Sequence, residues 1–146
     1  MKAIILAAGK GTRLDGAAVK PKCLVEIGGS TLLERQIETL RDANIRQIVV
    51  VVGFGAESIR AACDSEISFV ENTRFATTSS MYSLWLAREH LLDGFVVLNS
   101  DVLFHPELLT RLLTAPHDDA LLIDFVDKQN NQLGERQGPE LAWICL

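Results

Sequence analysis

The chain has 146 residues, of which 48% are hydrophobic and 23% charged, a balance typical of one soluble globular domain. Its formal net charge of −5 argues against a nucleic-acid-binding protein, because such proteins need a basic face to displace counterions. The three cysteines, Cys23, Cys63 and Cys145, are widely spaced and form no C-x-x-C pair, so neither a disulfide framework nor a zinc knuckle is indicated.

Hydrophobic runs and helical spacings alternate from the first residues onward. The run Lys2–Ala7 predicts a strand that is buried on both faces. Thr31 and Glu34 have the spacing of a capping box and predict the start of a helix that continues to about Ala43. The segment "QIVVVVG", Gln47–Gly53, predicts a second buried strand because it is short, β-branched and closed by glycine.

The same alternation continues through the middle of the chain. Residues 56–63 predict a short helix, residues 67–71 a strand, and residues 79–92 a longer helix. The apolar residues of this last helix recur at helical spacing and are predicted to face the core. These residues are Met81, Leu84, Trp85 and Leu91.

The segment "GFVVLNSD" predicts a further buried strand that ends at Asp101. Pro106 stands where the first turn of a helix is expected, and residues 120–125 predict a last strand. The resulting β-α alternation predicts an α/β fold, a Rossmann-like three-layer α/β/α sandwich with a mostly parallel central sheet. Ligands of such sheets bind beyond the carboxyl ends of the strands, so we expect the site in those loops.

The loop within "AIILAAGKGTRL" brings glycines and basic residues to the end of the first strand. It is not a P-loop, which requires G-x-x-x-x-G-K-[ST], and Leu14 stands where a dinucleotide fingerprint has its third glycine. What remains is a turn with unpaired backbone N–H groups followed by Arg13, whose guanidinium can bind phosphate oxygens in a bidentate manner. An ordinary tight turn is the alternative reading.

The segment "KPKCLVEIGG" places Lys20 and Lys22 on either side of Pro21. Proline favours an extended chain there, which would point both lysines to the same side. Two ammonium groups on one side indicate an anion between them, although a solvated basic loop would have the same sequence.

Together these two segments resemble the signature of the nucleotidyltransferase family that makes sugar nucleotides and CDP-alcohols. The later segment "ENTRFATTSSMYSLWLA" resembles the cytidylyltransferase branch that activates phosphocholine and similar phospho-alcohols, with matches at Asn72, Tyr82, Ser83 and Leu84. The segment "VVLNSDVLF" resembles the family's strand that ends in a magnesium-binding aspartate, here Asp101. The resemblance implies the nucleotide-diphospho-sugar transferase fold.

The resemblance also implies a reaction and roles for particular residues. The enzyme would transfer NMP, with CMP favoured, from an NTP to a phosphorylated small alcohol or sugar 1-phosphate and release pyrophosphate. Arg13 and Lys22 would contact the phosphates as catalytic residues, and Asp101 would hold Mg²⁺. The residues implied in nucleotide binding are Leu6, Ala7, Ala8, Gly9, Gly11, Thr12, Asn72 and Ser83.

Other readings of these residues stay open at the level of sequence. Asn72 and Ser83 are also residue types that cap helices, and Asp101 is also typical of a strand-end turn. A nucleotide-binding module that lacks the acceptor half is the alternative to a working transferase. A nucleotide-sugar glycosyltransferase is disfavoured because "NSD" lacks the first carboxylate of a D-x-D pair.

The last residues do not continue the pattern. We expect a nucleotide-binding domain over residues 1–126 and an atypical tail over residues 127–146, as in a truncated or frameshifted member of the family. Neither Asp124 nor Asp127 has a spacing that assigns it as the second metal ligand of the family. The apolar end of the tail leaves a homo-oligomer open. With no secretory signal and no span of membrane length, we expect a cytoplasmic protein without a membrane partner.

Overall fold

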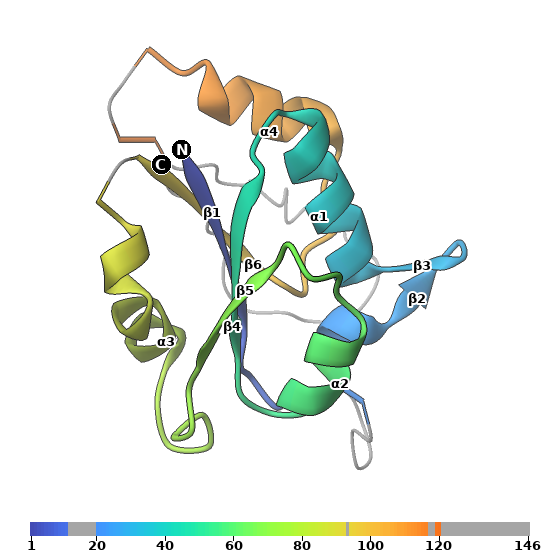
Figure 1. The fold of residues 1–146 in the computed structure, drawn as a ribbon. Helices are drawn as coiled ribbons and strands as arrows, with labels where there is room; N and C mark the ends of the chain where they lie inside the picture. The colour runs from blue at the N-terminus through green and yellow to red at the C-terminus, as the bar shows by residue number, and fades with distance from the viewer. Residues whose placement is uncertain (12–19, 93, 117–118, 121–146) are drawn as a thin grey trace, which may run out of the picture.

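Four short hydrophobic segments form a parallel sheet at the centre of the molecule (Figure 1). The computed structural model describes residues 1–11, 20–92, 94–116 and 119–120. In the order β5-β4-β1-β6, the strands are Ser68–Glu71, Gln47–Val52, Lys2–Ala7 and Phe95–Asn99. β1 lies between β4 and β6 and pairs with both in parallel.

The two faces of this sheet are buried in different surroundings. On one face, side chains of β1 and β4 such as Ile5 and Val50 pack with Leu33, Leu40 and Leu109 from the helices. The other face carries a smaller cluster, Ile4, Val49, Val51, Ala87 and Val97. Because both faces are covered, the strands are continuously hydrophobic instead of alternating with polar residues.

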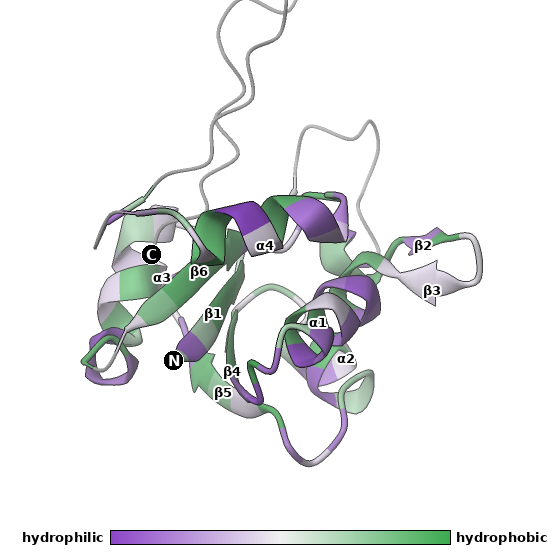
Figure 2. Ribbon diagram, turned by 90° about the horizontal axis from the view of Figure 1, so that it is seen from above, coloured by the Kyte–Doolittle hydropathy of each residue, from purple (hydrophilic) through white to green (hydrophobic). Residues whose placement is uncertain are grey.

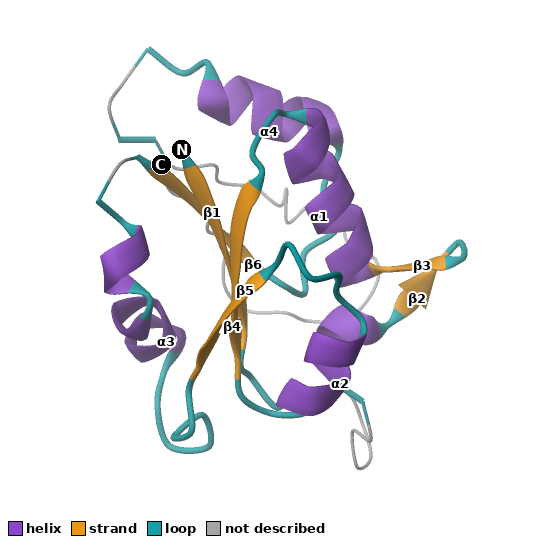
Figure 3. Cartoon of the chain, in the orientation of Figure 1, coloured by secondary structure: helices purple, strands orange, loops and turns teal. Residues whose placement is uncertain are grey.

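Helices form the outer layers (Figure 3). α1, α2 and α4 cover one face of the sheet, and α3 lies on the other face, followed by the short 3-10 helix η2. A second 3-10 helix, η1, precedes a small β2–β3 hairpin that projects from the body of the molecule. The bounds are Lys22–Leu24 for η1, Glu26–Ile27 for β2, Ser30–Thr31 for β3, Leu32–Asp42 for α1, Ala56–Ala61 for α2, Ser80–Leu86 for α3, Arg88–His90 for η2 and Pro106–Leu113 for α4.

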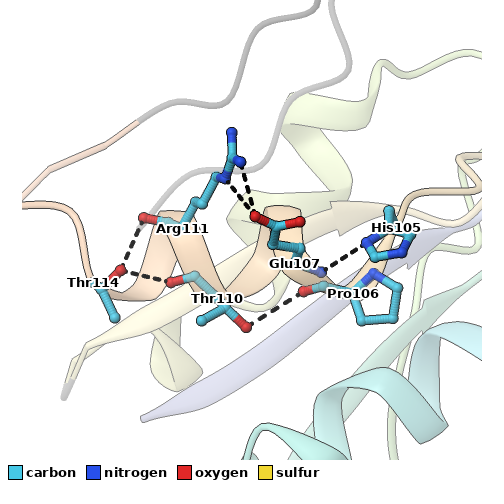
Figure 4. A network of polar contacts seen from close by, with 6 residues as sticks. All are labelled: His105, Pro106, Glu107, Thr110, Arg111 and Thr114. Carbon is cyan, nitrogen blue, oxygen red and sulfur yellow. Dashed lines mark hydrogen bonds and ion pairs between the residues drawn. The ribbon is translucent and has the colours of Figure 1, made fainter.

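Two helices begin with side-chain caps. Thr31 accepts from the backbone N–H of Glu34, and the Glu34 carboxylate accepts from the backbone N–H of Thr31, so the predicted capping box is present. At α4, His105 Nδ1 accepts from the N–H of Glu107 at 3.3 Å, next to the predicted Pro106 start (Figure 4). Hydropathy follows the same arrangement: the strands of the central sheet are mainly hydrophobic, while α1 and α4 also carry polar residues (Figure 2).

The predicted inward face of α3 is wrong for Met81 and Trp85. Met81 is 70% exposed and Trp85 is 53% exposed, whereas Leu84 packs against the sheet. The buried positions are instead taken by small residues: Ser83 within α3, and Ala87, which follows the helix as its C-cap. Trp85 instead stacks on Tyr82, with ring centroids 5.6 Å apart. The Arg88 guanidinium carbon lies 4.3 Å from the centroid of the Trp85 ring.

The fold prediction is otherwise confirmed, including the parallel sheet and the order of its elements. The predicted helix over residues 79–92 is divided into α3 and η2. The predicted strand over residues 120–125 lies outside the described residues beyond Ala120, as does the division of the chain at residue 126.

Candidate nucleotide site

The chain changes direction across the sheet at β1. From β1 it runs to β4 and β5 on one side, and then returns to β6 on the other side. The carboxyl ends of β1 and β6 are joined where the Ser100 N–H donates to the Leu6 carbonyl at 3.2 Å. A cavity of about 290 Å³ lies at this switch point, where open α/β sheets bind their ligands.

Four separate segments line the cavity: the end of β1 with its loop, the start of η1, the loop after β5 with α3, and the turn after β6. These segments are far apart in the sequence and meet because parallel strands end at the same edge of the sheet. The lining residues are Leu6, Ala7, Ala8, Gly9, Gly11, Pro21, Lys22, Cys23, Asn72, Phe75, Thr78, Ser79, Ser80, Ser83, Asn99, Ser100 and Asp101.

Lys22 is held against the glycine-rich loop. A Cβ placed on Gly11 would lie 2.6 Å from Lys22 Cγ and 2.6 Å from Lys22 Cε, so the aliphatic part of the lysine crosses the Gly11 backbone. Gly11 also has a φ of 64°, which residues other than glycine rarely adopt. Glycine is therefore required at this position for two reasons: it permits the positive φ of the turn and leaves room for the Lys22 side chain.

Lys20 does not share this arrangement. Pro21 is extended as predicted, with φ −55° and ψ 138°, but Lys22 starts η1 immediately afterwards. Lys22 lines the cavity, whereas Lys20 is exposed and is not among the lining residues. Of the two lysines, only Lys22 therefore lies at the cavity, and the structure does not bring the pair to one place.

Asn72 organises the loop that follows β5. Its side chain is buried, and Nδ2 donates to Thr78 Oγ1 and to Ser83 Oγ, both at 3.0 Å. Its Oδ1 accepts from the Arg74 N–H at 2.9 Å. Both amide hydrogens are therefore used inside the protein, and neither Asn72 nor Ser83 caps α3, whose N-cap residue is Ser79.

Phe75 forms an aromatic wall of the cavity beside Gly53. A Cβ on Gly53 would lie 2.7 Å from Phe75 Cβ and 2.8 Å from the Ala8 carbonyl oxygen. The ring of Phe54 meets that of Phe75 edge to face at 6.3 Å, and Lys10 Nζ lies 5.9 Å from the Phe75 ring centroid. The loops after β1, β4 and β5 are thus packed tightly around a residue without a side chain.

Cys23 is a buried thiol at the same cavity. Burial raises its pKa to about 12, and the nearby Asp101 charge acts in the same direction, while the Ser100 hydroxyl opposes the rise. The thiol is therefore protonated at neutral pH, and it supplies neither a nucleophile nor a thiolate ligand there.

The structure brings together most of the residues that the sequence predicted for the site. Thr12 and Arg13 lie outside the described residues. The sequence did not predict several other lining residues individually. The rule that ligands bind beyond the carboxyl ends of parallel strands does point to the loops in which most of them lie. The predicted residues that line the cavity are Leu6, Ala7, Ala8, Gly9, Gly11, Lys22, Asn72, Ser83 and Asp101. The lining residues missed are Pro21, Cys23, Phe75, Thr78, Ser79, Ser80, Asn99 and Ser100.

The chemistry of this lining suits a phosphorylated ligand and a hard cation. Asp101 is the one carboxylate among the described lining residues, and no three acidic, histidine or cysteine side chains of the described part gather as a metal cluster. Magnesium is commonly held by one or two carboxylates together with oxygens of a bound phosphate. A single aspartate at a cavity that Lys22 also lines fits that kind of shared coordination.

The sequence profile of the MobA-like NTP transferase domain matches residues 3–134. The chain belongs to this family. Members of the MobA-like NTP transferase family are nucleotidyltransferases, so the family resemblance seen in the sequence is confirmed.

Two relatives in this NTP transferase family come from Streptomyces and Streptococcus. The CMP-5'-(3-aminopropyl)phosphonate synthase of Streptomyces rubellomurinus is 34% identical over 127 residues, which cover 83% of this chain and 20% of that protein. The choline-phosphate cytidylyltransferase of Streptococcus pneumoniae is 38% identical over 106 residues, which cover 71% of this chain and 46% of that protein. The chain therefore spans about half the length of these relatives or less.

Solved structures of similar proteins show the same fold. The CTP:phosphocholine cytidylyltransferase of Streptococcus pneumoniae superposes with a TM-score of 0.64 at 35% identity, over 73% of this chain and 50% of that chain. A putative glucose-1-phosphate thymidylyltransferase of Bacillus anthracis superposes over 99% of this chain with a TM-score of 0.73. At 20% identity, the latter supports the fold alone. No helix in the described part of the chain has the length and apolar character needed to cross a membrane.

Proposed function

We propose that the cavity binds a nucleoside triphosphate and that the protein transfers its NMP group to a phosphorylated small alcohol or sugar 1-phosphate, with release of pyrophosphate. The observation that carries the proposal is the meeting of Gly9, Gly11, Lys22 and Asp101 at one cavity at the switch point of the sheet. Family membership independently supports a triphosphate ligand.

The reaction requires neither a nucleophile nor a general base from the protein. An oxygen of the acceptor phosphate attacks the α-phosphorus, a new P–O bond forms, and the bond to the bridging oxygen of pyrophosphate breaks. A phosphate monoester has a second pKa of about 6, so it is mostly dianionic at neutral pH and needs no general base. The protein must therefore align attacker and leaving group and offset the negative charge.

The chain has residues for each of these tasks. Lys22 supplies an ammonium group whose aliphatic stem crosses Gly11. The loop glycines have no side chain, so a phosphate can approach their backbone N–H groups closely. By the family resemblance, Arg13 supplies a second cation and Thr12 belongs to the same loop. Asn72 and Ser83, joined by a hydrogen bond, also line the cavity, and we expect the nucleoside to bind beside them.

Asp101 is the residue proposed to hold Mg²⁺, in concert with oxygens of the triphosphate. A bound magnesium ion supplies charge neutralisation at the phosphates and orients them. Asp101 lies two residues after the end of β6, and the hydrogen bond from the Ser100 N–H to the Leu6 carbonyl ties the intervening residue to the sheet.

CTP is the favoured nucleotide. Two observations support it: the resemblance of residues 72–84 to the cytidylyltransferase branch, and the similarity to the choline-phosphate cytidylyltransferase of Streptococcus pneumoniae. The acceptor would then be a phosphorylated alcohol, with sugar 1-phosphates as the alternative class.

The test is pyrophosphate release with each of the four NTPs in the presence of Mg²⁺ and one acceptor at a time: phosphocholine, phosphoethanolamine, aminoethylphosphonate or a sugar 1-phosphate. We expect release with CTP and one phospho-alcohol. Asp101→Asn should abolish turnover without unfolding the protein, because it removes the charge but hardly changes the volume. Unchanged magnesium-dependent turnover in Asp101→Asn would refute its role.

A nucleotide-binding module without turnover is the second candidate. It is favoured by the single carboxylate among the described lining residues. Triphosphate binding without pyrophosphate release from any pair would support this candidate over the transferase.

A further inference from the structure

One buried glutamine connects α1 to the turn that carries Asp101. Gln36 is 3% exposed, although it stands in the helix stripe that otherwise contains Leu33, Ile37 and Leu40. Its Nε2 donates to the carbonyl oxygen of Asn99 at 2.9 Å and to that of Val102 at 2.7 Å. Because both partners are carbonyl oxygens, only the nitrogen end of the amide can face them.

These two carbonyls stand on either side of Ser100 and Asp101. Asn99 is the last residue of β6, and the Val102 N–H donates back to its carbonyl at 3.4 Å. From the opposite side, the Ser100 N–H is bound to the Leu6 carbonyl of β1. The turn is thus fixed by the sheet on one side and by Gln36 on the other, and Asp101 projects from it at the cavity.

Burial of the Gln36 amide is energetically unfavourable at its oxygen. Its Oε1 is buried and has no hydrogen-bond partner among the described residues. An unpaired buried acceptor is unfavourable, and a leucine or methionine would fill the same helix stripe without it. The two donated hydrogen bonds are therefore the reason for an amide at this position.

We propose that Gln36 is a positioning residue for Asp101: it fixes the Asn99–Val102 turn so that the carboxylate is held at the cavity in the orientation that binds Mg²⁺. This inference rests on the proposed function, in which Asp101 holds the ion. Removal of a group that orients a metal-binding side chain without touching the metal typically weakens metal affinity about 10–100-fold.

The test uses Gln36→Met, which keeps the length and removes both donors. We expect the Mg²⁺ concentration for half-maximal pyrophosphate release to rise about tenfold or more. Leu40→Ala is the control, since Leu40 lies one turn further along α1 in the core. It should lower Tm and leave the Mg²⁺ dependence as it is in the wild type.

A second readout does not depend on activity. In Gln36→Met, hydrogen exchange of the Val102 amide should accelerate relative to that of Leu98 in the middle of β6, whereas in Leu40→Ala the relative rate should stay the same. If Gln36→Met does not fold, Gln36→Asn replaces it, because an amide one methylene shorter cannot reach both carbonyls, and the same two changes are expected.

The outcomes separate the two claims. Unchanged Mg²⁺ dependence together with an unchanged Val102-to-Leu98 exchange ratio would overturn the role of Gln36. A wild-type protein without any magnesium-dependent reaction would contradict the proposed function, and the exchange ratio would still decide whether Gln36 fixes the turn.

Discussion

Two glycines beside the cavity have opposite surroundings, and this difference separates folding from binding. Gly53 has no room for a side chain, since a Cβ there would meet Phe75 and the Ala8 carbonyl within 2.8 Å. Gly9 also lines the cavity, but a Cβ on it would have no atom of the described residues within 4 Å. The space at Gly53 is filled by protein, and the space at Gly9 is where we expect the ligand.

Substitution by alanine should therefore have different effects at these two positions. Gly53→Ala should lower the free energy of unfolding by about 1–3 kcal/mol, as overpacking typically does. Gly9→Ala should change it by less than about 0.5 kcal/mol, yet weaken triphosphate binding by about tenfold or more. Urea unfolding and calorimetric titration with CTP measure the two quantities. A Gly9→Ala protein that binds CTP as tightly as the wild type would contradict the placement of the phosphates.

At the scale of elements, the capping box of α1 is the clearest case of sequence determining local structure. Thr31 and Glu34 satisfy each other's backbone N–H groups, as their spacing predicted. The hydrogen bond from the Thr31 backbone, followed by that from its side chain, lowers the pKa of Glu34 below its usual value. The charged carboxylate is thus favoured in the folded state.

Thr31→Ala should cost about 1 kcal/mol of stability at neutral pH. The contribution of Glu34 should depend on pH. Because its pKa is lower in the folded than in the unfolded state, its stabilisation is present above the unfolded pKa and is lost as the pH falls through the folded pKa. The stability difference between wild type and Glu34→Ala should shrink in acid, measured by urea unfolding. Glu38→Ala, an exposed position on the same helix, is the control, and an equal pH dependence there would contradict the capping explanation.

The elements that the sequence did not predict were hidden for physical reasons. The β2–β3 hairpin has only two residues in each strand, and its signal is the Gly28–Gly29 pair, both with positive φ, in a segment read for its lysines. In α3, Ser83 can be buried because its hydroxyl oxygen accepts a hydrogen bond from Asn72 Nδ2. A prediction from hydrophobicity alone therefore placed Met81 and Trp85 on the buried side instead. Tertiary hydrogen bonds of this kind leave no periodic pattern in a sequence.

At the scale of the whole molecule, the sequence predicted the sheet and the edge at which the site lies. The buried strands are continuous hydrophobic runs, and parallel strands place their following loops together, so the fold and the loops of the site follow from pattern alone. The contacts that shape the cavity do not. Gln36 reaches carbonyls more than sixty residues away, and Lys22 crosses Gly11 through a 3-10 turn that the extended-chain expectation missed.

The net charge of −5 bears on how the ligand is recognised. An acidic protein gains little from long-range attraction of a triphosphate, so affinity must come from the local groups at the cavity, with Lys22 as the central one. Lys22→Ala should accordingly weaken binding strongly, while Lys20→Ala, two residues away and exposed, should have a small effect.

The most direct test of the account is a calorimetric titration of the wild-type protein, Lys22→Ala and Lys20→Ala with CTP in the presence of Mg²⁺. We predict saturable binding to the wild type and to Lys20→Ala, and a loss of about tenfold or more in affinity for Lys22→Ala. The contrary result would be a folded wild-type protein that binds none of the four NTPs, or equal affinities for all three proteins.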